Sequence, residues 1–210
     1  MRLARHQFAD EDLQNAERHI RESPASSAWR CLRCWFAAHA GQFEKAHEDL
    51  DWLAANRFAA LPRDANWLPA MFELTEAVCL LGDRPRAAEL YRLLLPYGNR
   101  HISAMRGTVS WGSGQAMLGR LASTAGKLDQ AALHFDAALV LERSWGARAW
   151  LVKTRASYAT TLAARGGPGD HNRATALARE AIAQAETLQI ILTGIPSTVR
   201  PLVDRSLLRS

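Results

Sequence analysis

A glycine that ends one helical stretch and opens a turn recurs four times in this 210-residue chain. Each copy has a helical stretch, the glycine, a short turn and a second helical stretch that opens with alanine. The copies read AAHAGQFEKAHEDL, CLLGDRPRAAELY, STAGKLDQAALHF and AARGGPGDHNRATALA. The turn glycines Gly41, Gly82, Gly126 and Gly166 are spaced by 41, 44 and 40 residues. A nearly constant period in this range indicates stacked helical repeats, so repetition constrains the fold more than any other feature.

The third copy shows this repeated pattern most clearly. Gly119, Gly126, Ala131, Phe135 and Ala138 fall at offsets 0, 7, 12, 16 and 19. We expect Gly119 to let the first helix approach its partner closely, and Gly126 to end that helix in the left-handed conformation. Ala131 and Ala138 then keep the second helix near the first, and Phe135 fills the space between them.

The other copies carry small and large apolar residues at matching places. These residues are Ala46, Leu50 and Leu53 in the first copy, Ala87, Tyr91 and Leu94 in the second, and Ala174, Ala178 and Ala181 in the fourth. In the fourth copy Gly167, Pro168 and Gly169 lengthen the turn. The sequence therefore predicts an all-α chain with four helix pairs over residues 28–188.

These residues resemble the tetratricopeptide repeat, a helix-turn-helix with small and large apolar residues at such places. The period exceeds the roughly 34 residues of that family, because extra residues lie between pairs at 56–66, 96–113 and 142–147. The longer period is similar to the C-terminal repeat region of large bacterial ATPases and LuxR-type transcriptional regulators. The phrases FAALPRDANWL, YRLLLPYGNRH and LERSWGARAWLVKTRASYATTLAARGGPGD look like that region. The resemblance implies an α-α superhelix, a TPR-like solenoid with flanking helices.

The segments outside the repeats are assigned by pattern. Residues 1–27 are expected to form a flanking helix and a linker, with Leu13, Ala16 and Ile20 on one apolar helix face. Residues 189–210 contain two prolines and are either a cap over the last pair or a tail. The connection at 96–113 is long for such an array, and loops of this length are often functional or partly helical.

The bulk composition excludes several classes of protein. Hydrophobic residues are 48% and charged residues 22% of the chain, which is ordinary for a globular protein. No apolar run approaches the roughly 18 to 20 residues of a membrane span, and the N-terminus lacks the apolar core of a secretory signal. Three cysteines without a framework spacing indicate reduced thiols and a cytoplasmic location.

Several short motifs partly match known functional sites, but each lacks a residue or spacing that the site requires. Cys31 and Cys34 form a C-x-x-C, but no second pair completes a zinc site, so we expect buried structural thiols. GRLASTAGKL, residues 119–128, lacks the spacing and the Ser or Thr of a phosphate loop. HEDLD, residues 47–51, has an aspartate where a zinc helix needs its second histidine. We therefore expect no metal, no cofactor and no catalytic group.

Tryptophan is abundant in this chain. Core packing between successive repeats is the default interpretation, and recognition of a partner is the alternative, because aromatic residues are enriched at interaction hot spots. The seven are Trp29, Trp35, Trp52, Trp67, Trp111, Trp145 and Trp150.

The resemblance implies where a ligand would bind, because the first helix of each pair lines the concave face of such arrays. The groove positions carried over from the family are Cys31 and Trp35, Phe72 and Glu76, Ala116, Arg120 and Ser123, and Lys153 and Thr160. From these the partner-binding residues are predicted to be Trp35, Phe72, Glu76, Arg120, Ser123 and Lys153. Such a groove, aromatic at one end and cationic at the other, could accept an extended peptide or an acidic tail. An ordinary solvated inner face is the alternative.

The leading hypothesis is a non-enzymatic protein-interaction or effector-sensing module of bacterial signal transduction or transcriptional regulation. Its partners would be proteins or peptides, including the ATPase or DNA-binding parts of a larger regulator. The last helical stretch, RATALAREAIAQAETL, has no strongly polar cap, which favours either a piece of a larger regulator or a homodimer formed through an end. The alternative is a nucleic-acid-binding protein that uses arginines such as Arg100, Arg106, Arg120 and Arg148. A helical enzyme is the third hypothesis.

Overall fold

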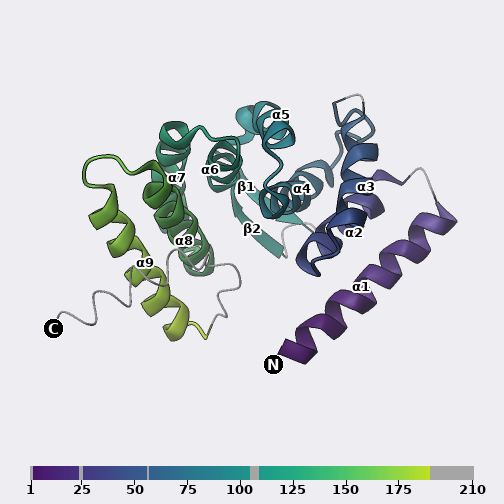
Figure 1. Cartoon of the computed structure of the whole chain (residues 1–210), viewed down its shortest axis with the longest axis horizontal. Helices are drawn as coiled ribbons and strands as arrows, with labels where there is room; N and C mark the ends of the chain where they lie inside the picture. Colours follow the sequence, from purple (N-terminus) through teal and green to yellow (C-terminus); the bar gives the residue numbers. More distant parts are fainter. Residues whose placement is uncertain (1, 24–25, 56, 105–108, 190–210) are drawn as a thin grey trace. The chain divides into compact units, whose positions relative to one another are not determined.

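The computed structural model describes residues 2–23, 26–55, 57–104 and 109–189 (Figure 1). The described helices and strands are α1 Arg2–Glu22, α2 Ser27–His39, α3 Phe43–Ala54, α4 Trp67–Leu81, α5 Arg84–Leu94, the 3-10 helix η1 Leu95–Tyr97, β1 His101–Ala104, β2 Val109–Ser113, α6 Gly114–Thr124, α7 Leu128–Ser144, α8 Arg148–Arg165 and α9 Asp170–Thr187. The chain is therefore mostly helical, as predicted.

The chain divides into two compact units. Unit 1 comprises residues 1–93 and 102–110, and unit 2 comprises residues 94–101 and 111–210. In unit 1, α2 packs against α1, α3 and α4. In unit 2, α7 packs against both α6 and α8, and α8 packs against α9, so neighbouring helices lie side by side (Figure 1).

The predicted helix pairs coincide with α2–α3, α4–α5, α6–α7 and α8–α9. All four turn glycines have positive φ, from +65° at Gly166 to +81° at Gly126, a conformation that side chains with a Cβ disfavour. The predicted apolar positions of the second helices are buried in every pair; Ala46, Ala87, Ala131 and Ala174 are fully so. The repeat pattern therefore predicted the pair boundaries and their buried residues.

The α6–α7 pair packs as the third copy predicts. A Cβ built on Gly119 would lie 2.8 Å from two ring carbons of Phe135, which is closer than real Cβ atoms approach. Phe135 itself is fully buried between Ala131 and Ala138, which are fully buried too. The absence of a side chain at Gly119 therefore makes the space that this ring occupies.

The connection at 96–113 is the main difference from the all-α prediction. It contains η1 and the two paired strands β1 and β2, and the shortness of the link between the strands requires antiparallel pairing. Ile102, Val109 and Trp111 are residues that favour extended structure, and Ile102 is fully buried. A connection that could have been an irregular loop thus pairs its backbone in a short sheet.

The N-terminal helix was predicted by its apolar face but begins earlier than that face indicates. Leu13, Ala16 and Ile20 are buried, and α1 extends from Arg2 to the predicted break after Glu22. The predicted C-terminal cap or tail at 189–210 lies outside the described residues apart from Gln189. In the described ranges, no helix combines the length and the apolar character that a bilayer crossing demands.

The core-packing interpretation of the tryptophans is confirmed for Trp67 and contradicted for Trp52 and Trp145. Trp67 alone is buried among the seven; Trp52 and Trp145 are exposed and the other four are half-buried. Polar groups contact several of the rings: His19 stacks on Trp29 with 4.0 Å between centroids, and Arg30 lies over Trp52. Indole rings of this amphipathic kind cover charged stems at a surface rather than filling a core.

Candidate binding face on helices α6 and α8

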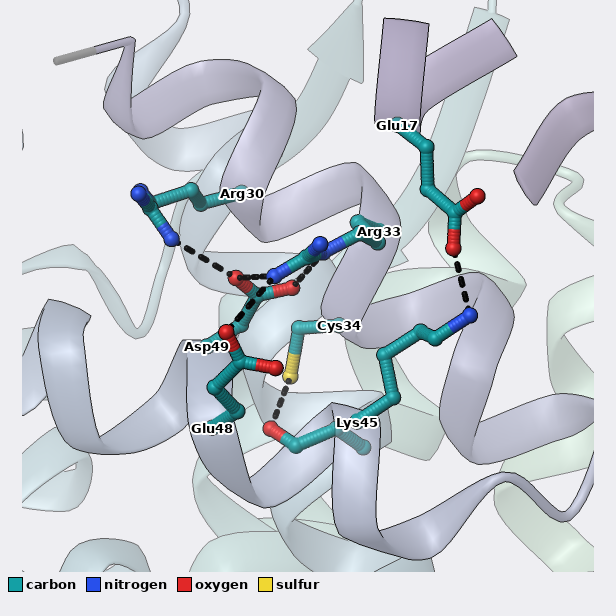
Figure 2. A network of polar contacts seen from close by, with 8 residues as sticks. Glu17, Arg30, Arg33, Cys34, Lys45, Glu48 and Asp49 are labelled. Atoms are coloured by element: carbon teal, nitrogen blue, oxygen red, sulfur yellow. Dashed lines mark hydrogen bonds and ion pairs between the residues drawn. The ribbon is translucent and has the colours of Figure 1, made fainter. Parts of the chain in front are cut away.

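The polar cluster of unit 1 lies between α2 and α3 (Figure 2). Asp49 is fully buried and receives two hydrogen bonds from Arg33, at 2.6 and 2.7 Å, and one from Arg30 at 3.2 Å. The Asp49 carboxylate raises the pKa of Arg33 by accepting these hydrogen bonds. Asp49, the middle residue of the HEDLD motif, is thus held by two guanidinium groups, and the arrangement fixes α2 to α3.

A second ion pair fixes α1 to α3. Lys45 donates a hydrogen bond to Glu17, as Figure 2 shows, and this bond lowers the pKa of Glu17. Both cationic groups of this region, Lys45 and the Arg30–Arg33 pair, therefore have carboxylate partners. Charge in this part of unit 1 is matched locally, which is the pattern of a structural network.

The C-x-x-C thiols are buried, as expected from the sequence. Cys31 and Cys34 are both fully buried, and the Cys34 thiol donates a hydrogen bond of 3.5 Å to the Ala46 carbonyl. Burial raises the pKa of both thiols, and the Glu73 carboxyl on α4 raises that of Cys31 further. Glu73 is only 6% exposed, and burial raises its pKa to about 8. Within the described ranges, no three His, Cys, Asp or Glu side chains are placed to hold a metal ion.

Of the three predicted partner-binding residues of unit 1, one is buried in the core and two are half-buried. Phe72 is 5% exposed and belongs to the core, so its predicted place on an open face is wrong. Cys31, another predicted groove position, is fully buried for the same reason: α2 packs directly against α4. Trp35 and Glu76 are half-buried, and the Trp35 ring contacts Phe36 and His39 on its own helix.

In unit 2, helix α6 begins at a buried polar junction. The Ser113 hydroxyl accepts a hydrogen bond of 3.1 Å from the Ala116 N–H, which caps the helix, and donates one of 2.9 Å to Glu142 on α7. Glu142 is fully buried, and burial raises its pKa. This junction fixes where α6 starts and therefore where its later residues Arg120 and Ser123 lie.

Arg120 on α6 and Lys153 on α8 bring two cations to one place. Burial lowers the pKa of Arg120 to about 10. Lys153 is exposed overall, but burial of part of its side chain lowers its pKa, and the nearby charge of Arg120 lowers it further. The Lys153 ammonium lies 4.5 Å from the centroid of the Trp150 ring on the same helix. Two cations that repel each other, one resting on an aromatic face, favour an anion in their vicinity.

Two further contacts hold α6, α8 and the Trp150 ring in place around these cations. Thr161 on α8 donates a hydrogen bond of 2.9 Å to the Ser123 hydroxyl on α6, which joins the two helices one to two turns from the cations. The Trp150 ring packs on Gly112, where a Cβ would lie 3.0 Å from ring carbons. The structure thus brings together Arg120, Ser123 and Lys153, the three predicted partner-binding residues of unit 2. We call the surface formed by Arg120, Ser123, Trp150, Lys153 and Thr160 the α6–α8 face.

The predicted groove positions included neither Trp150, which belongs to this surface, nor Gly112, on which its ring packs. A local signal for Trp150 was present, because residues three apart on a helix are neighbours and Trp150 precedes Lys153 by three. Gly112 had no such signal, since its contact with Trp150 depends on the strand pairing that the sequence did not predict.

Many arginines of the described surface are engaged with acids, which weighs against a general nucleic-acid interface. Ion pairs join Arg86 to Asp51 and Asp83, Arg155 to Glu180, Arg165 to Asp129 and Asp170, and Arg173 to Asp136. Among the arginines predicted for that role, Arg100 and Arg148 are exposed, Arg120 belongs to the α6–α8 face and Arg106 lies outside the described residues. Backbone-directed binding of nucleic acid needs clustered cations rather than arginines neutralised one by one.

Comparison of the chain with models of known protein families, with curated proteins and with solved structures found no match.

Proposed function

We propose that this chain is a cytoplasmic, non-enzymatic binding scaffold of the tetratricopeptide-like kind. It recognises an extended acidic segment of a partner protein through the α6–α8 face. The observation that carries the proposal is the pair of mutually repelling cations, Arg120 and Lys153, on the first helices of two successive pairs. These were predicted as the cationic part of a concave groove.

An acidic ligand would relieve an unfavourable arrangement. Burial and mutual repulsion lower the pKa of Lys153, so a carboxylate placed beside it stabilises the charged form twice, by attraction and by screening Arg120. Hydrogen bonds to charged groups contribute about 1.5–3 kcal/mol each, so one cation accounts for roughly tenfold or more in affinity. The hydroxyls of Ser123 and Thr160 offer the polar contacts that an extended backbone needs.

The resemblance to the repeat region of bacterial ATPase-linked regulators motivates the biological role. In such a protein the scaffold would report the presence of its partner to an ATPase or DNA-binding part. A repeat array transmits such a signal through small changes between neighbouring helix pairs, because each pair contacts only its neighbours. The partner supplies the acidic segment, and this chain supplies the cationic face.

Isothermal titration with a synthetic peptide tests the proposal. The probe is an acetylated peptide with several glutamates, and its control is the same peptide with glutamine in place of each glutamate. We expect binding of the acidic peptide only, weakened about tenfold in Lys153→Gln and unchanged in Lys127→Gln, which alters another lysine of unit 2. Circular dichroism of each variant checks that it is folded.

Two outcomes would overturn the proposal. One is equal binding of the two peptides, which would remove charge from the recognition. The other is tight binding of a single-stranded oligonucleotide whose logarithmic affinity falls steeply with the logarithm of the salt concentration, together with no binding of the acidic peptide. That result would favour the nucleic-acid hypothesis instead.

A further inference from the structure

Helix α7 carries an apolar stripe on the side away from its buried residues. Leu133 is 71% exposed and Val140 is 65% exposed, the highest values among the large apolar side chains of the described residues. Ala137 is half-buried and lies between them, so the three occupy positions i, i+4 and i+7 of one helix face. Single exposed apolar residues are ordinary, but two on one face of one helix form a surface that association would bury.

The ends of this stripe differ in charge. Asp129 and Gln130 are exposed in the first turn of α7, and Arg143 is exposed in its last turn. With a rise of 1.5 Å per residue, Gln130 and Arg143 are about 20 Å apart along the axis, with the apolar residues between them. The face is therefore acidic or neutral at one end, apolar in the middle and basic at the other end.

We propose that this face binds a second copy of the chain, with two α7 helices packed antiparallel about a two-fold axis. The axis passes between Asp136 and Ala137. Leu133 then lies opposite Val140 of the second copy, and Asp129 lies near Arg143 of the second copy. The small side chain of Ala137 lets the two helices approach at the centre.

Self-complementarity of charge selects a second copy in this orientation. The antiparallel arrangement puts Asp129, which also pairs with Arg165 of its own chain, near Arg143 of the second copy twice, once at each end, as an isologous contact requires. A parallel arrangement would put Arg143 against its own equivalent, where the two guanidinium charges repel each other. Antiparallel packing also opposes the two helix dipoles, so each helix end meets the partial charge of opposite sign.

The size of the face sets the expected strength. A stable interface buries about 800 Å² on each partner, and one helix face of this length supplies only part of that area. The contact is therefore a weak and reversible one, with a dissociation constant on the order of 100 µM. It does not involve the α6–α8 face residues, so it is independent of the proposed acidic-peptide binding.

Sedimentation equilibrium of the full chain over a wide concentration range tests the proposal. We expect a reversible monomer–dimer equilibrium that is lost in the double variant Leu133→Glu, Val140→Glu. The matched control is Leu80→Glu, which puts the same charge at another exposed leucine and should leave the equilibrium unchanged. A wild-type chain that stays monomeric throughout, or a dimer that persists in the double variant, overturns the proposal.

The predicted register gives a test that loss of folding cannot imitate. Arg143→Gln removes one ion pair with Asp129 at each end and should weaken the dimer about 3- to 10-fold, whereas Gln130→Ala, on the opposite flank of the stripe, should leave it unchanged. In a Cys79→Ser background, Ala137→Cys should form a disulfide between two copies on mild oxidation. The control Ala176→Cys, on the exposed surface of α9, should not. Equal cross-linking at both positions, or no weakening by Arg143→Gln, contradicts the antiparallel register.

Discussion

The Asp49 cluster of unit 1 and the α6–α8 face of unit 2 arrange charge in different ways. In unit 1 the carboxylate of Asp49 meets two guanidinium groups, and Lys45 meets Glu17, so each charge has a partner of opposite sign. In unit 2 the ammonium of Lys153 is placed where Arg120 repels it. Charges matched within the fold serve the fold, whereas neighbouring like charges on a surface suit the binding of an anion.

The largest expected effect comes from removing the central charge of unit 1. Asp49→Ala leaves Arg30 and Arg33 beside an empty buried site, and breaking such a pair costs about 3–5 kcal/mol of unfolding free energy. Urea denaturation followed by circular dichroism measures the loss. Glu48→Ala is the matched control, because Glu48 is exposed and lies 3.6 Å from Arg33; it should cost less than about 1 kcal/mol. A similar loss for the two variants would break the contrast between buried and exposed pairs.

The next effect is a dependence of stability on pH in unit 1. The folded-state pKa of Glu73 is raised to about 8 from an ordinary value of 4.5, so the fold favours the protonated carboxyl. Its stabilisation is fully present below about pH 4.5 and is lost as the pH rises toward 8. The change is on the order of 4 kcal/mol.

Urea titrations at a series of pH values test this dependence, with Glu73→Gln as the comparison. The variant should lack most of the decline between pH 5 and 8, because glutamine has no proton to lose. All three cysteines lie in unit 1, so their reaction with a thiol reagent under increasing urea reports the opening of that unit. An equal decline in the variant would assign the pH dependence to another group.

Close packing in unit 2 gives a smaller effect. Gly119→Ala places a methyl group 2.8 Å from the Phe135 ring, and overpacking of this kind costs about 1–3 kcal/mol. Alanine also raises helix propensity by about 1 kcal/mol, so a net loss shows that the close approach dominates. Calorimetric melting measures it. A melting temperature equal to or above that of the wild type would contradict the packing of α6 on α7.

The smallest expected effect on stability, that of replacing Lys153, gives the clearest contrast with the Asp49 cluster. Lys153→Met removes a cation whose charged form the fold disfavours, so we expect stability to be unchanged or raised by less than about 1 kcal/mol at pH 7. Denaturant titration beside Asp49→Ala measures the contrast directly. A substantial loss of stability would show that Lys153 serves the fold as Asp49 does.

The parts of the fold that could be predicted depend on local pattern. The turn at Gly126, the close approach at Gly119 and the burial of Phe135 follow from spacings within one helix pair, so the repeat revealed them. The burial of Phe72 could not be predicted, because α4 is apolar on nearly every side. Its periodicity therefore does not distinguish an open face from a packed one. The strand pairing was missed because it depends on contacts between two very short segments.

The candidate site was predicted only in part for a related reason. Arg120, Ser123 and Lys153 lie on the first helices of successive pairs, and the repeat period alone was enough to align them. The environment that shifts their properties comes from tertiary structure: Gly112 packs on Trp150, and Ser113 with Glu142 fixes the start of α6. Spacing in the sequence carries no record of burial, so neither the repulsion between the cations nor their lowered pKa values could be foreseen.

The pKa of Lys153 with and without an acidic peptide tests the central claim most directly. The chain has only three lysines, Lys45, Lys127 and Lys153, so reductive methylation with ¹³C-labelled formaldehyde gives a simple NMR spectrum in which each amine titrates separately. We predict that the glutamate-rich peptide raises the pKa of Lys153 from its lowered value, while the glutamine peptide does not and the other two lysines do not respond. Binding of the acidic peptide with the pKa of Lys153 unchanged would contradict the account.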